Sequence, residues 1–257
     1  MSLHRFYLPP THCGGSELVL TDEEAHHALD VLRVKPGQRV AVLDGEGHVY
    51  HCDVQTADKR RVVLKVLQKH TVRPLPYQVT LLQAVLKGKA MDWLVQKATE
   101  LGAHRLVPLL SERSTVHPEE TAGAKTVKWQ TKVIEAAKQC GSAWLTRVET
   151  PVTIPDYLAR EERFDLSLIT SLRPDRRHPR EWFQAYSTDH GRPPERLSVW
   201  VGPEGDFTPA EIHAIQAAGA RPISLGPLIL RSETAAIYGL SVLNYELQAP
   251  RVEAAQP

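Results

Sequence analysis

The stretches GPEGDF at residues 202–207 and LGPLILRSETA at residues 225–235 decide the fold of this chain. Each stretch follows a short apolar run and leads into a helical pattern of apolar residues. Glycine at such a junction lets the backbone approach a ligand closely, or adopt dihedral angles that a Cβ atom forbids. Two such turns in succession predict one pocket, built mostly from backbone, at the C-terminal ends of strands.

Apolar strand patterns alternate with helical patterns from residue 77 onward. Strands are predicted at 79–85, 106–109, 165–169, 197–201 and 222–225. Helices are predicted at 91–101, 124–140 and 234–247. Short apolar strands between helices are typical of a mostly parallel sheet that is covered on both faces. The residues alone therefore predict an α/β domain at 77–247 with a plain, unknotted doubly wound sheet.

Residues 1–72 have a different, β-rich pattern. Segments 40–43 and 48–54 flank a Gly-containing turn and predict a hairpin, and 61–67 predicts a third strand. One helix interrupts these strands, and its start has the capping-box spacing of Thr21 and Glu24. The apolar face of this helix is predicted to carry Ala25, Ala28, Leu29 and Leu32. Short strands around one helix indicate a small barrel, and the two prolines within 73–76 predict a linker.

The overall composition restricts the class of protein. The chain has 257 residues and a formal net charge of +1, so any nucleic acid must be bound by local basic patches. The three cysteines show no C-x-x-C spacing and favour a reducing cytoplasm. No apolar run is long enough to span a membrane, and the N-terminus lacks the apolar region of a signal peptide. The 12 histidines contain no H-E-x-x-H pattern, so no metal site is expected.

The residues beside the two turns have competing interpretations. Thr208, Pro209 and Glu211 form a complete helix start, which makes Glu211 structural. Glu204 and Asp206 could be solvated turn residues, and Arg231 with Glu233 could be a surface ion pair beside a capping Ser232 or Thr234. Basic clusters raise the expectation of a phosphate backbone as ligand; they lie at 59–61, 125–132 and 173–180, and at Lys87 and Lys89.

Taken together, these motifs resemble the α/β-knot (SPOUT) methyltransferases, and most of all the family that methylates N3 of a uridine in 16S ribosomal RNA. The resemblance rests on the stretches 202–207 and 225–235. It extends in order through His26-His27, Val31-Leu32-Arg33, 97–102, Ser111–Ser114 and Glu135–Gln139. Two positions depart from the family pattern: Asp206 replaces a glycine, and Ser142 replaces an arginine.

The resemblance implies a fold and partners that periodicity does not give. It implies a SPOUT trefoil-knot domain with a parallel sheet at 77–247, preceded by a small PUA-like RNA-binding β-barrel domain at 1–72. It also implies S-adenosylmethionine as cofactor and a cytoplasmic homodimer. The partner would be 16S ribosomal RNA, within the assembled 30S subunit, with no membrane involved.

Roles for individual residues follow from the resemblance and from the chemistry of methyl transfer. Uridine N3 carries a proton, so the enzyme must remove it and stabilise the negative charge that develops on the base. Arg231 is the candidate to stabilise this charge, Glu233 is the candidate base and Glu204 is the alternative base. The expected cofactor cradle comprises Gly202, Pro203, Gly205, Leu225, Gly226, Ile229 and Leu230. The expected RNA contacts are Arg5, Arg33, Lys87, Lys89 and Arg113.

Two other functions remain open at this point. The chain could bind RNA or assist ribosome assembly without transferring a methyl group. It could also be a nucleotide-dependent enzyme on a doubly wound sheet, although it has neither G-x-G-x-x-G nor a GK[ST] phosphate loop. Affinity for S-adenosylmethionine, or for ATP or NAD instead, distinguishes these functions.

Overall fold

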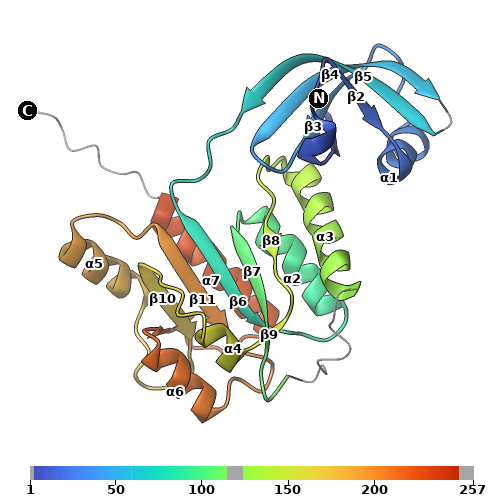
Figure 1. Ribbon diagram of the computed structural model, residues 1–257. Helices are drawn as coiled ribbons and strands as arrows, with labels where there is room; N and C mark the ends of the chain where they lie inside the picture. Colours follow the sequence, from blue (N-terminus) through green and yellow to red (C-terminus); the bar gives the residue numbers. More distant parts are fainter. Residues whose placement is uncertain (1–2, 59, 115–123, 249–257) are drawn as a thin grey trace, which may run out of the picture. The chain divides into compact units, whose positions relative to one another are not determined.

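The computed structural model describes residues 3–58, 60–114 and 124–248, and the chain forms two compact units (Figure 1). The N-terminal unit ends at Leu75 and is joined by Val133–Leu145. The C-terminal unit comprises Pro76–Lys132 and the residues from Thr146 onward. The division falls within the predicted linker at 73–76. The segment Val133–Leu145, however, lies inside the range predicted for the second domain and clusters with the N-terminal unit.

The N-terminal unit contains a curved five-stranded sheet in its described residues. Its strands are β1 (His4–Tyr7), β2 (Glu17–Leu20), β3 (Arg39–Leu43), β4 (His48–Asp58) and β5 (Arg61–Thr71), in the order β1-β3-β4-β5-β2. The predicted hairpin is confirmed, because β3 pairs antiparallel with β4 and Leu43 lies opposite Val49. The predicted third strand is also confirmed, and it extends to Thr71.

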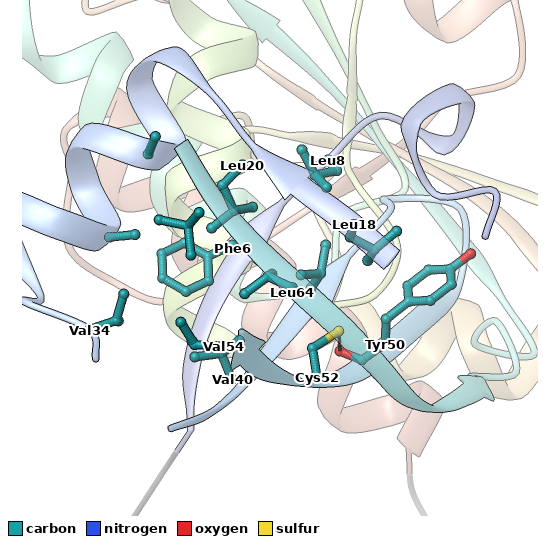
Figure 2. Packing of buried hydrophobic residues seen from close by; sticks show 14 of the residues in the cluster. Phe6, Leu8, Leu18, Leu20, Val34, Val40, Tyr50, Cys52, Val54 and Leu64 are labelled. Carbon is teal, nitrogen blue, oxygen red and sulfur yellow. Dashed lines mark hydrogen bonds between the residues drawn. The ribbon is translucent and has the colours of Figure 1, made fainter. Parts of the chain in front are cut away.

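Alternating residues of these strands fill the core of the N-terminal unit (Figure 2). Side chains on one side of each strand point inward, as expected for a sheet with one solvated face. Phe6, Leu20 and Leu64 are fully buried. Other members of this cluster are Leu8, Leu18, Val34, Val40, Tyr50, Cys52 and Val54. Burial of these apolar side chains, each contributing about 1.5–3 kcal/mol, stabilises the curved five-stranded sheet.

The helix of this unit differs from the prediction in its start and its form. Helix α1 (Asp22–His26) continues into a π-helical turn at His27–Val31. The predicted capping box is wrong: Thr21 makes no side-chain cap hydrogen bond. Glu24 instead accepts hydrogen bonds from the Tyr7 backbone N–H at 3.1 Å and from Lys138 Nζ at 2.6 Å. The Glu24 carboxylate therefore binds partners that are distant in the sequence, instead of capping the start of its own helix.

The C-terminal unit contains a seven-stranded sheet whose described neighbours all run parallel, as predicted. Its strands are β6 (Gln78–Ala84), β7 (Arg105–Leu110), β8 (Arg147–Val148), β9 (Val152–Thr153), β10 (Leu166–Thr170), β11 (Arg196–Val201) and β12 (Arg221–Ile223). The order is β12-β10-β11-β6-β7-β8, and β9 also pairs with β7. The helices assigned to this unit are α2 (Lys89–Glu100), α4 (Ile154–Leu158), α5 (Pro179–His190), α6 (Pro209–Ala217) and α7 (Ser232–Gln248). Helix α3 (Ala124–Cys140) contributes residues to both units.

Helices cover both faces of this parallel sheet. Leu82 and Trp200 pack on one face with α4 and α6. On the other face, α7 packs against β11, where a Cβ on Gly239 would be in ordinary van der Waals contact with Val199 Cγ2 at 3.7 Å. Side chains alternate between the two faces along a strand. Leu81 and Gln83 of β6 lie opposite Val199 and Val201 of β11, so their side chains are on the face that α7 covers. The C-terminal ends of the central strands are left for loops.

Candidate active site

The two Gly-rich stretches line one pocket of about 300 Å³ in the C-terminal unit. The pocket lies beyond the C-terminal ends of β10 and β11 and beside the start of α7. Its wall comprises Thr170, Ser171, Leu172, Val201, Gly202, Pro203, Glu204, Asp206, Leu225, Gly226, Leu228, Ile229, Leu230, Arg231, Ser232 and Ala235. The prediction that both turns form one pocket at strand ends is confirmed.

Backbone constraints fix the conformation of the first turn. A Cβ on Gly202 would lie 3.0 Å from Asp206 Oδ1 and from the Phe207 nitrogen, so a larger residue would require the turn to shift. Asp206 has φ of 59°, in the left-handed region. Its Oδ1 accepts a hydrogen bond of 2.8 Å from the Phe207 N–H. Aspartate therefore occupies the position for which the family pattern has glycine, and a local hydrogen bond offsets part of the strain.

The second turn presents open backbone donors and apolar side chains. Gly226 has φ of 107°, which only glycine adopts at low cost. Among the residues that the structure describes, the backbone N–H groups of 228–231 have no hydrogen-bond partner. Leu228 and Ile229 expose 73% and 82% of their surface. This wall therefore suits a ligand with hydrogen-bond acceptors and apolar parts.

Glu211 has the structural role that its position in the sequence predicted. Its Oε2 accepts a hydrogen bond of 2.8 Å from the Thr208 N–H, and Thr208 Oγ1 accepts one of 3.2 Å from the Glu211 N–H. The buried carboxylate also accepts hydrogen bonds from Ser111 Oγ and from the Glu112 N–H. Glu211 thus joins α6 to the loop that follows β7.

The three candidate catalytic residues occupy different positions. Arg231 is exposed in the pocket wall, and its guanidinium forms no ion pair with any described residue. The interpretation as a surface Arg–Glu pair therefore has no support in the described part of the chain. Glu204 is exposed in the same wall. Glu233 lies in the first turn of α7 but is not a wall residue, and Gly205 is also outside the wall.

The candidate RNA contacts also differ in their surroundings. Arg113 reaches the first turn, where its Nη1 donates a hydrogen bond of 2.8 Å to the Gly205 carbonyl. Lys87 and Lys89 are exposed at the start of α2. In the N-terminal unit, Arg5 Nη1 donates to the carbonyls of Lys138 and Gln139, at the end of α3. Arg33 is exposed and has φ of 53°.

Several wall residues were not predicted from the sequence. Thr170, Ser171 and Leu172 follow β10 directly, so the end of the predicted strand at 165–169 was a usable signal. The sequence predicts only a helix-cap role for Ser232. Its hydroxyl instead lies between Gln83 and the carbonyl of Gly202.

The described residues contain no group of three or more histidine, cysteine or acidic side chains that could hold a metal ion. Among the helices in the described part of the chain, none is long and apolar enough to cross a membrane.

Comparison with known proteins agrees with this architecture. A family model described as an RNA methyltransferase domain matches residues 73–244. The ribosomal RNA small subunit methyltransferase E of Aquifex aeolicus is 32% identical over 244 residues, covering 94% of this chain and 99% of that protein. The chain belongs to the ribosomal RNA small subunit methyltransferase E family. The Bacillus subtilis member is 30% identical, with coverage of 90% of this chain and 91% of that protein.

Solved structures of similar proteins support the same fold. A family member from Neisseria gonorrhoeae, bound to S-adenosyl methionine, aligns with a TM-score of 0.82 at 28% identity. The alignment covers 95% of this chain and 98% of that chain. A Legionella pneumophila protein in complex with the cofactor SAM aligns with a TM-score of 0.84 at 31% identity, with the same coverage. An RNA methyltransferase PUA domain matches residues 20–67. The expected SPOUT fold with a PUA-like N-terminal domain is confirmed.

Proposed function

We propose that this chain is an S-adenosylmethionine-dependent methyltransferase that methylates N3 of a specific uridine in 16S ribosomal RNA. The observation that carries the proposal is the pocket formed by the two family stretches, with Arg231 in its wall and in no ion pair with the described residues. Membership of the family supplies the reaction class. The N-terminal PUA-like unit is proposed to hold the RNA. Residues 1–72 and 77–247 are proposed as the two functional domains, with Val133–Leu145 of the second range packing in the N-terminal unit.

The pocket wall fits the proposed cofactor. S-adenosylmethionine carries hydrogen-bond acceptors on its adenine and carboxylate, and the open N–H groups of 228–231 are matching donors. The apolar side chains of Leu225, Ile229 and Leu230 suit the adenine ring. Gly202, Pro203 and Gly226 shape the rest of the cradle, and Gly205 supports it from outside the wall. When bound, the cofactor supplies an activated methyl group, so no metal is required.

The residues of the chain then have to prepare the base. Arg231 is proposed to lie over the uracil and stabilise the negative charge that develops when the N3 proton leaves. Because its guanidinium forms no ion pair with the described residues, it is available for this contact. Glu233 is proposed to accept the N3 proton, directly or through water, and Glu204 is the alternative because it already lies in the wall.

The target base must leave any stack to enter a pocket of this kind. The proposed RNA contacts of the C-terminal unit are Lys87, Lys89 and Arg113, which are exposed. Arg113 holds the first turn through the Gly205 carbonyl, so it would connect RNA binding to the shape of the pocket. Arg5 and Arg33 are the proposed contacts of the N-terminal unit. The proposed substrate is RNA within the assembled 30S subunit.

We also propose that the protein is a homodimer. Apolar and aromatic side chains remain exposed from the second turn along α7: Leu228 at 73%, Ile229 at 82%, Tyr238 at 48% and Tyr245 at 69%. A hollow of about 420 Å³ beside Leu225 and Gly226 continues to Tyr238 and Tyr245. An exposed apolar surface of this kind is typical of a protein interface. A second copy would cover it and complete the cofactor pocket.

The proposed location is the cytoplasm, where ribosomal RNA is found. The described structure contains Cys13, Cys52 and Cys140 as free thiols. Burial raises the pKa of Cys13 to about 11 and that of Cys52 to about 12, so both are unreactive, protonated core residues.

The decisive experiment is mass mapping of methylated nucleosides in 16S ribosomal RNA from cells with and without this protein. The proposal expects N3-methyluridine to disappear from one position and to return when the gene is restored. An unchanged signal would overturn it. If the purified protein also failed to bind S-adenosylmethionine in calorimetry, the alternative of an RNA-binding or assembly module would be favoured.

A further inference from the structure

A buried series of hydrogen bonds runs from Gln83 through Ser232 to Gly202, and the last two residues line the pocket. Gln83 Nε2 donates a hydrogen bond of 2.9 Å to Ser232 Oγ. Ser232 Oγ in turn donates one of 2.5 Å to the carbonyl of Gly202. Gln83 is fully buried and Ser232 is 5% exposed. These hydrogen bonds therefore join three elements, because Gln83 belongs to β6, Gly202 follows β11 and Ser232 begins α7.

The sheet fixes one end of this series. Gln83 lies opposite Val201 in the parallel pairing of β6 with β11, so its position relative to Gly202 is set by the strand register. Its Nε2 also donates a hydrogen bond of 2.9 Å to the carbonyl of Ala84, which orients the amide. Both amide donors are engaged, and the Gln83 Oε1 atom is buried without a partner among the described residues. A buried acceptor without a partner costs free energy, and a role in positioning the pocket gives one reason for keeping this amide.

The other end of this hydrogen-bond series, Ser232, directly follows residues 228–231. The N–H groups of 228–231 make no hydrogen bonds within the described residues, and the first helical hydrogen bond of α7 runs from the Ala235 N–H to the Arg231 carbonyl. Ser232 is adjacent to Arg231, and its hydroxyl is the side-chain contact that ties this helix start to the first turn. This hydroxyl thus links the residue that follows Arg231 to the Gly202 turn.

We infer that Gln83 and Ser232 are positioning residues for methyl transfer, because their hydrogen-bond chain holds Arg231 and the Gly202 turn at a fixed separation. The inference rests on the proposed function, since it assigns Arg231 to the reaction. Neither side chain is required to touch the reacting atoms. A displacement of about 1 Å in a reacting group can reduce a rate about 100-fold, so a small relaxation of α7 is sufficient for a large effect.

The test compares Ser232→Ala and Gln83→Met with the wild-type protein. We expect each variant to reduce kcat about 10- to 100-fold, while KM for RNA and the Kd for S-adenosylmethionine change little. The double variant is expected to be no worse than the more affected single variant, because both remove the same chain. Ser232→Thr retains a hydroxyl and is expected to keep most of kcat.

Ser198→Ala is the matched control. Ser198 is a fully buried serine of β11 whose hydroxyl donates to Ser167 Oγ at 2.8 Å, away from the pocket wall. The Ser198→Ala variant is expected to change the stability of the protein without changing kcat per folded molecule. A near-wild-type kcat in Ser232→Ala, additive losses in the double variant, or an equal loss in Ser232→Thr would each overturn the inference. Failure of the wild-type protein to methylate RNA would instead overturn the proposed function.

Discussion

At the scale of single residues, Arg231 lies in the pocket wall and is the residue proposed to stabilise negative charge on the base. We expect Arg231→Ala to lower kcat about 100- to 1000-fold, because it removes a fixed charge from the place where negative charge develops. Affinity for S-adenosylmethionine should remain close to wild type, since backbone groups form most of the cradle. Single-turnover methylation and calorimetry measure the two quantities. Arg192→Ala is the control, because Arg192 pairs with Asp165 outside the pocket. Near-normal turnover in Arg231→Ala would contradict the assignment.

Asp206 is the second informative residue, because its backbone has a φ of 59°. Residues with a Cβ atom are strained in this left-handed conformation, and glycine is not. We expect Asp206→Ala to be less stable than Asp206→Gly by about 1 kcal/mol, since alanine keeps the left-handed strain without the hydrogen bond to the Phe207 N–H. Urea unfolding of the two variants measures the difference. Equal stability of the alanine and glycine variants would show that the turn relaxes when the aspartate is removed.

At the scale of elements, the start of α6 depends on one carboxylate. We expect Glu211→Ala to lower the free energy of unfolding by about 2–3 kcal/mol, because it removes a cap and leaves the buried Ser111 hydroxyl and the Glu112 N–H without their partner. Methyl transfer per folded molecule should be unchanged. Glu181→Ala is the matched control: it removes the capping-box glutamate of α5, which is exposed, and should cost less. A loss of kcat without a loss of stability would give Glu211 a role in catalysis.

Most elements follow from sequence pattern because their causes are local. Apolar spacing predicted the helices at 91–101 and 234–247, short apolar runs predicted the parallel strands, and the Thr208–Glu211 spacing predicted the start of α6. The wrong capping box at Thr21 and Glu24 has a non-local cause. Glu24 is bound by Lys138, which is far away in the sequence. Likewise, only the folded sheet brings Gln83 to Ser232 and places the end of β10 beside both turns.

At the scale of the whole molecule, stability in acid depends on a carboxylate at the N-terminal end of the sheet. Asp165 directly precedes β10. Burial opposes ionisation of Asp165, but hydrogen bonds from Arg192 and from the Arg196 and Glu195 N–H groups outweigh it and lower its pKa. A lowered folded-state pKa stabilises the protein above the unfolded pKa of about 3.9, and this stability is lost as the pH falls further.

Asp165→Asn should therefore lose about 1 kcal/mol at pH 7, after allowance for solvent screening, and should flatten the pH dependence of stability below about pH 4. Urea unfolding at a series of pH values measures this. An unchanged slope in the variant would mean that other carboxylates control acid unfolding.

The proposed dimer can be tested without touching the cofactor wall. Tyr245 is 69% exposed on α7, and we expect Tyr245→Asp to shift the protein toward the monomer mass in sedimentation equilibrium, because it places a charge in an apolar interface. Val127→Asp changes a side chain of similar exposure, 68%, on α3 and should have no effect. A monomeric wild-type protein, or a fully dimeric Tyr245→Asp variant, would contradict the proposed interface.

The division of α3 between the two units limits how this protein can be rebuilt or recombined. Lys138, only 6% exposed, forms ion pairs with Glu24 at 2.6 Å and with Glu135 at 2.7 Å inside the N-terminal unit. A gene fusion that carried only the residues up to Leu75 would leave Glu24 without Lys138 and the Gly47 N–H without the Ala143 carbonyl. The N-terminal unit therefore cannot be transferred as one continuous segment, because two separate stretches of the gene, up to Leu75 and Val133–Leu145, encode it.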